Sequence, residues 1–242
     1  MLKTAIVTGA STGIGKAIAL ELSKSYDRIG ITSYHHPEAL MDTCALIRES
    51  GTDCIAVKGD CGDATFVQEF VATIISSWGK IDTLVNNAGI SYVGLLTDMK
   101  IEEWEHLLRT NLSSTFYFCH AVIPHMVHEH AGQILNISSV WGEVGASCEA
   151  AYSATKGGIN ALTQALGKEL APSGIAVNAI SCGAINTSMN HCFSKEELME
   201  LEQSIPYGRM AEPEEVAQFA SHLLASPNYL TGQVIRFDGG WI

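Results

Sequence analysis

The sequence predicts one α/β domain with a doubly wound, mostly parallel sheet of seven strands. Short apolar runs alternate along the chain with segments whose apolar residues recur at helical intervals, and this alternation predicts βαβ units. The runs do not alternate apolar with polar residues, which is typical of strands covered on both faces. No linker, repeat or low-complexity tract interrupts the pattern, so we expect residues 1–242 to form a single domain.

Seven apolar runs mark the expected strands, and the segments between them carry the expected helices. The runs cover residues 2–7, 29–34, 54–57, 81–85, 134–137, 175–180 and 234–237. Helical spacing is expected over residues 14–22, after Pro37, over 66–74, over 101–130, over 152–170 and after Pro213. Pro124 lies inside the longest of these segments, and we expect it to kink or interrupt the helix because proline lacks the N–H that a helix uses.

Charge and cysteine content limit the partners and the location of the chain. Its formal charge is -12, from 26 acidic and 14 basic residues. Nucleic acids and anionic lipids bind through Lys and Arg, so we expect no nucleic acid and no membrane as partners. None of the seven cysteines forms a C-x-x-C pair, which argues against a disulfide framework or a structural metal site. With no signal-peptide pattern in the first residues, we expect a reducing, cytoplasmic location.

A glycine-rich turn follows the first strand, in the string Thr8-Gly-Ala-Ser-Thr-Gly-Ile-Gly15. Glycine allows a tight turn, and the helix that follows offers free N–H groups to a pyrophosphate. The spacing G-x-x-x-G-x-G differs from the usual dinucleotide pattern G-x-G-x-x-G. The motif therefore predicts a nucleotide site, although a glycine turn without a ligand has the same local sequence.

A second polar motif, Asn86-Asn87-Ala88-Gly89, ends the fourth strand. Its asparagine side chains can fix neighbouring loops, and the small Ala88 and Gly89 leave room for a ligand. An ordinary polar turn explains the same four residues equally well.

The strongest motif for chemistry follows the fifth strand. Ser139 closes that strand, Tyr152 comes thirteen residues later, and Lys156 follows four residues after it. Positions i and i+4 share one face of a helix, so the Lys156 ammonium can approach the Tyr152 phenol. A nearby cation favours the phenolate and lowers a pKa that is ~10 in a free tyrosine. Tyr152 is therefore a candidate proton donor and acceptor.

These motifs occur together in one known family. The sequence resembles the short-chain dehydrogenase/reductases over its full length, in the glycine turn, Asn86-Asn-Ala-Gly89, Asn111, Ser139, Tyr152 and Lys156. The ending fits through Pro206-Tyr-Gly-Arg209, Glu212-Pro-Glu-Glu215, Thr231-Gly-Gln-Val234 and Asp238-Gly-Gly240. The resemblance implies a Rossmann-type domain and a homotetramer.

The resemblance implies roles for four side chains in carbonyl reduction. Tyr152 would give a proton to the carbonyl oxygen as NAD(P)H delivers hydride to the carbon. Lys156 would lower the pKa of Tyr152 and hold the nicotinamide ribose. Ser139 would hydrogen-bond the carbonyl, and Asn111 would seat a water that relays protons to Lys156. This chemistry needs no metal.

The resemblance also implies which residues bind the nucleotide. They are Gly9, Ser11, Thr12, Gly13, Ile14, Gly15, Tyr34, His35, Asp60, Cys61, Asn87, Ala88, Gly89, Tyr152, Lys156, Gly183, Ile185 and Thr187. Cys182 departs from the family, which usually has proline there in the loop that meets the nicotinamide. We expect the contacts to persist in a looser loop, with Cys182 packed rather than reactive.

The end of the second strand bears on the choice of nucleotide. NAD enzymes of this family usually have an acidic residue there for the ribose hydroxyls, and none is present. The Arg or Lys of many NADP enzymes is also absent. Because Ser33, Tyr34 and His35 could donate hydrogen bonds to a 2′-phosphate, we favour NADP(H), with NAD(H) as the alternative.

Two substrates follow from two levels of resemblance. The broad one is to 3-oxoacyl-acyl-carrier-protein reductases, but the stretches that dock the acidic carrier protein, residues 125–133 and 171–174, carry no Arg or Lys here. The narrower one, in residues 140–149 and Gly239-Gly240-Trp241, is to bacterial elongation factor P 5-aminopentanone reductases. Glu143 and Glu149 could meet the amine of that ketone, which a lysine of the factor carries. Both glutamates are otherwise explained as solvated loop charges.

The sequence thus predicts an NAD(P)H-dependent ketone reductase, with a substrate that a protein can carry. The aminopentanone-modified lysine of elongation factor P is the first candidate, and a 3-oxoacyl carrier protein is the alternative. A non-catalytic nucleotide sensor is a more remote alternative, since a sensor need not keep a proton donor such as Tyr152.

Overall fold

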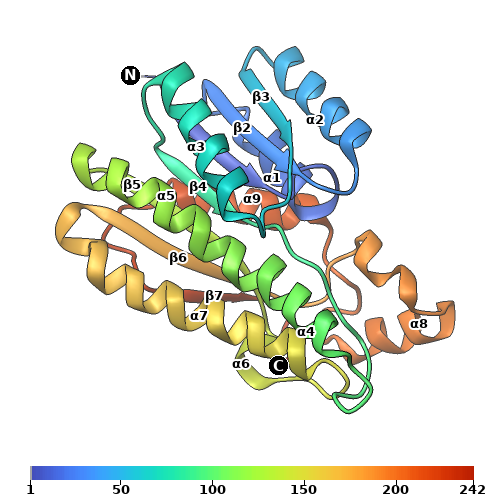
Figure 1. The fold of residues 1–242 in the computed structure, drawn as a ribbon. Coiled ribbons are helices and arrows are strands. Elements are labelled where there is room, and N and C mark those ends of the chain that lie inside the picture. Colours follow the sequence, from blue (N-terminus) through green and yellow to red (C-terminus); the bar gives the residue numbers. More distant parts are fainter. Residues whose placement is uncertain (1) are drawn as a thin grey trace.

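The seven expected strands form one sheet in the computed structural model, which describes residues 2–242 apart from the side chains of His191 and Cys192 (Figure 1). The strands are β1 (Thr4–Thr8), β2 (Arg28–Ser33), β3 (Asp53–Lys58), β4 (Thr83–Asn86), β5 (Gly132–Ser139), β6 (Ile175–Cys182) and β7 (Val234–Phe237). Their order across the sheet is β3-β2-β1-β4-β5-β6-β7, and every neighbouring pair is parallel. The prediction of a doubly wound parallel sheet is confirmed.

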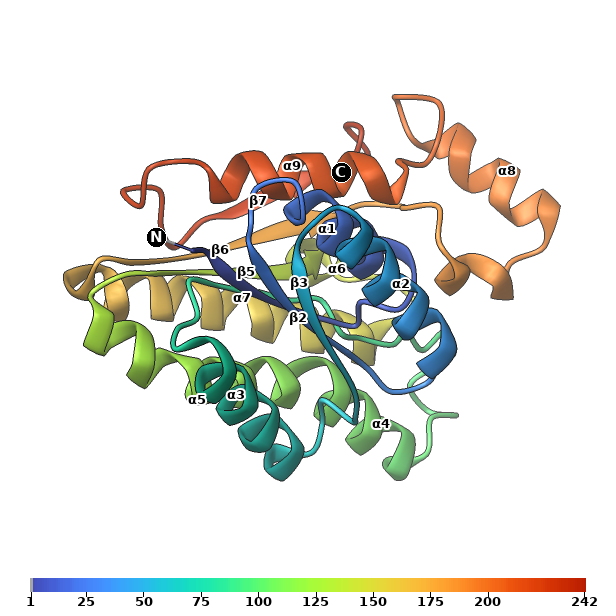
Figure 2. The same ribbon diagram turned by 90° about the horizontal axis from the view of Figure 1, so that it is seen from above.

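Helices cover both faces of the sheet (Figure 2). One face carries α1 (Gly13–Leu22), α2 (Pro37–Glu49) and α9 (Pro213–Leu224), and the other carries α3 (Ala64–Trp78), α5 (Ser114–Glu129) and α7 (Ala150–Leu170). Successive residues of β1 alternate between the two cores, since Ala5 and Val7 pack with the first group of helices while Ile6 packs with the second. Burial on both faces explains why the strands read as unbroken apolar runs.

The helix around Pro124 differs from its prediction. α5 continues through Pro124, which is exposed on the outer side of the helix, so water can solvate the carbonyl that loses its partner. The regular helix changes earlier instead. A π-helical turn, η1 (Arg109–Ser113), separates α4 (Ile101–Leu108) from α5, and it carries Asn111. Such turns are frequent at functional sites.

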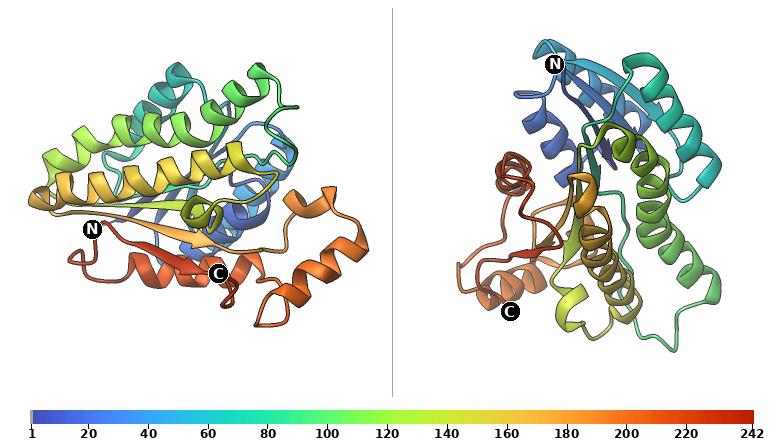
Figure 3. Two further views of the ribbon diagram at one scale, coloured as in Figure 1. Left: turned by 90° about the horizontal axis from the view of Figure 1, so that it is seen from below. Right: turned by 90° about the vertical axis from the view of Figure 1, so that its left-hand side faces the viewer.

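Two helices at the carboxyl edge of the sheet were not predicted. α6 (Trp141–Val144) is a single turn after β5, and α8 (Lys195–Ser204) stands apart from the two helix layers (Figure 3). Short 3-10 turns, η2 (Ala171–Ser173) and η3 (Ser188–Cys192), complete the helical segments. Among the described residues, no helix is long and apolar enough to cross a membrane.

Candidate active site

A cavity of about 640 Å³ opens at the carboxyl ends of four adjacent strands. Gly9 follows β1, Asn87 follows β4, Ser139 ends β5 and Cys182 ends β6, and all four residues line it. The chain reverses its direction of winding between β1 and β4, and parallel sheets bind ligands at such a switch point. A volume of this size is typical of a small-molecule or cofactor site.

The asparagine motif after β4 fixes the glycine turn after β1. The Asn87 side-chain amide donates to the backbone oxygens of Thr8 and Gly9, over 3.0 and 3.2 Å. In return, the Thr8 hydroxyl accepts from the backbone N–H groups of Asn87 and Ala88, over 2.9 and 3.0 Å. The Thr8 hydroxyl also donates to the backbone oxygen of Val85 in β4, 77 residues along the chain. The two motifs are therefore one structural unit.

The glycine turn fits a phosphate group. Gly9 and Gly13 have φ of 65° and 54°, in the left-handed region that favours glycine, and a Cβ on Gly9 would lie 2.9 Å from the Cα of Ala88. The first turn of α1 carries no acidic side chain, so the helix N-terminus offers its N–H groups without a competing carboxylate. Ser11, Thr12 and Ile14 line the same cavity, whereas Gly15 packs beneath the turn, against Gly9 and Asn87.

Lys156 lies buried on α7 with its ammonium inside the site. Nζ donates to the backbone oxygen of Ile137 over 2.9 Å and lies 5.6 Å from the centre of the Tyr152 ring. Burial lowers the pKa of Lys156 to about 8, because the charged form is poorly solvated there. The predicted approach of Lys156 to Tyr152 is therefore present in the fold.

The pKa of Tyr152 departs from its prediction. Desolvation raises it above the ordinary value of tyrosine, and a hydrogen bond with Ser139 offsets only part of that rise. The Glu149 carboxyl and the Cys182 thiol raise it further. The protein by itself therefore keeps the phenol protonated near neutral pH, in the form that donates a proton.

Asn111 joins two segments at the side of the cavity. Its side-chain oxygen accepts from Ile90 N over 2.8 Å, and its amide nitrogen donates to Ile90 O over 2.9 Å and to the Thr155 hydroxyl over 3.2 Å. These contacts occupy the side chain, which ties the loop after β4 to α7. Its role in seating a water for a proton relay stays a prediction.

The end of the cavity beside β2 is lined by Ser33, His35 and His36. The Ser33 hydroxyl lies 2.8 Å from that of Ser11, which fixes the end of β2 against the glycine turn. Tyr34, which the resemblance assigned to the nucleotide, is 51% exposed and does not line the cavity. His36 was not among the predicted nucleotide contacts, although it adjoins His35 in the sequence.

Asp60 and Cys61 also lie outside the cavity lining. Asp60 accepts from Gly62 N over 2.8 Å and lies 3.9 Å from the Arg109 guanidinium. Cys61 is buried, and burial raises the pKa of its thiol to about 12. Their predicted contact with the nucleotide has no support from the lining of the cavity.

The loop after β6 brings the remaining predicted residues to the cavity, namely Gly183, Ile185 and Thr187. Gly183 N donates to Phe237 O over 2.9 Å, which keeps the loop paired with β7. Cys182 is buried beside Lys156, and desolvation raises the pKa of its thiol to about 12. A packed, unreactive thiol is the form that we expected at this position.

The two glutamates predicted to meet the substrate are separated by the fold. Glu149 lines the cavity, where burial raises its pKa and a hydrogen bond from Trp141 lowers it in part. Glu143 lies outside the lining and pairs with Arg236 over 2.7 Å, a hydrogen bond that lowers its pKa. The predicted contact of Glu143 with the substrate therefore has no support from the cavity lining, because β7 brings a cation to this carboxylate that its local sequence does not show.

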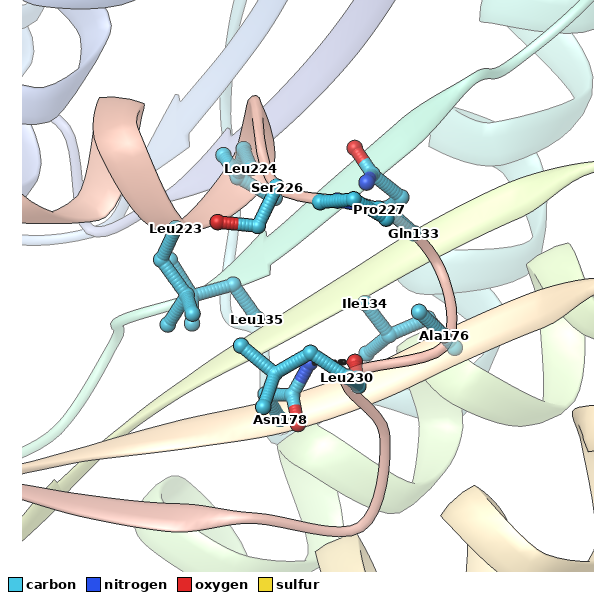
Figure 4. Close-up of a pocket in the computed structure, with 10 residues that line it drawn as sticks. All are labelled: Gln133, Ile134, Leu135, Ala176, Asn178, Leu223, Leu224, Ser226, Pro227 and Leu230. Atoms are coloured by element: carbon cyan, nitrogen blue, oxygen red, sulfur yellow. Dashed lines mark hydrogen bonds between the residues drawn. The ribbon is translucent and has the colours of Figure 1, made fainter.

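A second depression lies at the opposite edge of the sheet (Figure 4). The starts of β5 and β6 and the segment after α9 form it, with Gln133, Asn178 and Leu230 among its lining residues. Its volume of about 10 Å³ has room for about one water molecule, so it is too small for a substrate. No group of three or more potential metal ligands occurs among the described residues.

A glycine turn at a switch point, together with Ser139, Tyr152 and Lys156 in one cavity, is the arrangement of a nucleotide-dependent oxidoreductase. Comparison with known proteins agrees. A family model described as short chain dehydrogenase matches residues 3–198. The chain belongs to the short-chain dehydrogenase family, and it is an NAD(P)-dependent oxidoreductase acting on carbonyl or hydroxyl groups.

Individual relatives align over nearly the whole chain. The chain is 36% identical over 241 residues to the 3-oxoacyl-acyl-carrier-protein reductase FabG of Staphylococcus aureus, covering 99% of this chain and 98% of that protein. It is 38% identical over 242 residues to a 3-oxoacyl-acyl-carrier-protein reductase of Synechocystis, covering 99% and 97%. It is also 35% identical over 243 residues to the uncharacterized oxidoreductase YmfI of Bacillus subtilis, covering 100% and 99%.

Proposed function

We propose that the protein reduces a ketone, with hydride from a nicotinamide nucleotide and the proton from Tyr152. The observation that carries this proposal is that Tyr152 lines the same cavity as Ser139, Lys156 and the glycine turn. Desolvation raises the pKa of Tyr152, which favours the protonated phenol. When bound, the nucleotide supplies the hydride. Ser139 would donate a hydrogen bond to the ketone oxygen, and Tyr152 would protonate that oxygen as negative charge develops on it.

A 3-oxoacyl group on a carrier protein is the substrate that the relatives favour. Two of the aligned proteins carry that activity in their names, at 36% and 38% identity. This reverses the order of the two substrates inferred from the sequence. A short 3-oxoacyl chain needs only hydrogen-bond donors at the ketone and an apolar wall, and Ser139, Tyr152, Phe193 and Leu201 line the cavity with both.

An aminopentanone on a lysine of elongation factor P is the second candidate, and Glu149 favours it. The Glu149 carboxyl lines the cavity and has no salt-bridge partner among the described residues. A cationic amine would relieve the cost of burying that charge. Residues 125–133, at and after the end of α5, and residues 171–174 at η2 also carry no arginine or lysine to attract an acidic carrier protein, although Lys168 lies in the last turn of α7.

NADP(H) is the nucleotide that we propose, with NAD(H) as the alternative. Ser33, His35 and His36 line the cavity at the end of β2, and residues 32–36 include no Asp or Glu that would repel a 2′-phosphate. A carboxylate at this position would instead favour NAD through the ribose hydroxyls.

One assay tests the activity, the nucleotide and the substrate together. Oxidation of NADPH and of NADH is followed with a 3-oxoacyl carrier protein and, in parallel, with aminopentanone-modified elongation factor P. Tyr152→Phe should lower kcat by about 100-fold or more on the true substrate, since general acid catalysis contributes that much, and should leave NADPH affinity unchanged. Equal, slow rates in wild type and Tyr152→Phe, with tight nucleotide binding, would favour the nucleotide sensor instead.

Glu149→Gln separates the two substrates. It should weaken kcat/KM for the amine-bearing ketone and spare the 3-oxoacyl group, because only the amine carries a charge for the carboxylate to meet. Equal losses on both substrates would remove the argument for an amine.

A further inference from the structure

Residues 238–242 fold back over the carboxyl edge of the sheet and close one side of the active-site cavity. Gly239 and Gly240 both adopt the left-handed region, with φ of 67° and 81°, so the chain turns sharply after Asp238. The Asp238 carboxylate holds the turn by accepting from Gly240 N over 3.0 Å and from Ile242 N over 3.1 Å. The turn places the side chain of Trp241 in the cavity wall.

Trp241 links two segments that border the cavity. Its ring centre lies 4.8 Å from that of Trp141 on α6, with 56° between the ring planes. Its Nε1 donates to the hydroxyl of Ser204, the last residue of α8, over 2.9 Å. Leu201, on the same helix, lines the cavity. The Trp241 indole therefore contacts both α6, which follows Ser139, and the end of α8.

The ion pair of Glu143 and Arg236 fixes the two tryptophans relative to each other. Glu143 shares the single turn α6 with Trp141, and Arg236 of β7 donates one Nη to Glu143 and the other to the backbone oxygen of Ile242, next to Trp241. Both ends of the pair thus hold a segment that carries an indole. Arginine suits this task, since its planar fork bonds two acceptors in fixed directions.

We propose that Trp241 determines the specificity of the ketone reduction, and that Glu143 and Arg236 position it. This inference rests on the proposed function. Trp241 follows β7, four places along the sheet from the glycine turn after β1, so its ring lies at the substrate end of the cavity. The two indoles contact each other, and hydrogen bonds hold Trp241 to Ser204 and Trp141 to Glu149, so they form a rigid wall. Such a wall accepts an unbranched aliphatic chain beside the ketone and excludes a chain branched next to the carbonyl.

Two isomeric ketones test the wall. The N-acetylcysteamine thioesters of 3-oxoheptanoic acid and of 4,4-dimethyl-3-oxopentanoic acid contain the same atoms, but only the second is branched beside the ketone. The wild type should prefer the straight isomer, and Trp241→Ala should lower the ratio of kcat/KM values, straight over branched, by about tenfold or more, a typical effect of a methyl-sized change in a pocket. Trp241→Phe keeps an aromatic wall and should keep most of the preference.

Positioning by the ion pair has its own readout. Glu143→Gln should lower the ratio of kcat/KM values by a smaller factor than Trp241→Ala does, mainly through KM of the straight isomer. Glu143→Asp keeps the carboxylate and should restore part of the wild-type ratio. Tyr229→Ala is the matched aromatic control, because Tyr229 is 100% exposed, and it should leave the ratio unchanged. NADPH affinity, measured for each variant, reports whether the nucleotide end remains folded.

The outcomes separate the inference from the proposed function. If the wild type reduces neither of the two thioesters and neither of the two protein-borne ketones, both the proposed function and the role of Trp241 are overturned. If the wild type is active and both Trp241→Ala and Trp241→Phe keep its ratio of kcat/KM values, with normal NADPH affinity, only the role of Trp241 is overturned. A ratio that changes in Trp241→Ala but not in Glu143→Gln would leave the wall and remove the positioning role.

Discussion

Asn87→Ala should destabilise the protein and weaken its nucleotide site through a single pair of hydrogen bonds. The Asn87 amide donates to Thr8 O over 3.0 Å and to Gly9 O over 3.2 Å, both at the turn that would receive the phosphates. At about 1 kcal/mol for each bond, the loss is about 2 kcal/mol. A chain of this size loses about 2–4 °C in Tm per kcal/mol, so Tm should fall by about 4–8 °C.

The measurement pairs thermal unfolding with NADPH titration of the same samples. Affinity for the nucleotide should fall together with Tm, since the released turn must be ordered again when the phosphates bind. Asn228→Ala is the matched control, because its exposed amide donates to Gly174 O over 2.9 Å, far from the site. Its effect on stability should stay below about 1 kcal/mol, with no change in NADPH affinity.

Asn87→Asp sharpens the test, because it keeps the shape of the side chain and replaces the donor with an acceptor that faces two carbonyl oxygens. It should be at least as unstable as Asn87→Ala. If Asn87→Ala instead keeps its Tm within about 1 °C of the wild type, the amide does not hold the glycine turn and the reasoning is refuted.

Three further predictions follow from burial in the site. Burial lowers the pKa of Lys156 to about 8, whereas the unfolded chain keeps this proton to about pH 10. Between pH 8 and about pH 10 the unfolded state therefore binds more protons, so the Tm of the wild type should rise relative to that of Lys156→Met. A difference in Tm that stays constant over this range would contradict the prediction. Iodoacetamide at neutral pH should label exposed Cys148 rapidly and buried Cys182 slowly, as read by mass spectrometry, and equal rates would show that Cys182 is open. Gly15→Ala should lose NADPH binding, because its Cβ would overlap the backbone oxygen of Gly9, whereas Gly51→Ala has open space and should bind normally.

Local patterns were sufficient for most of the fold. The central strands were visible because both of their faces are buried, which leaves an apolar run without polar alternation, such as residues 5–7 of β1. Pro124 was misjudged because the cost of proline depends on whether its helix face meets water, and sequence does not report exposure. The single turn α6 and the outlying α8 were missed because neither has a buried residue to create an apolar period.

The sequence by itself determined the chemistry that depends on neighbours along the chain. Tyr152 and Lys156 share one face of α7 because they are four residues apart, and the glycine turn precedes α1 directly. Only the tertiary structure decided the contacts between distant segments. Glu143 meets Arg236 across 93 residues, and Trp141 meets Trp241, because the order of strands places β7 beside β6 and next to the turn after β5. No periodicity in the sequence marks an ion pair between distant residues. Only the fold therefore shows that Glu143, which we predicted to contact the substrate, pairs with Arg236.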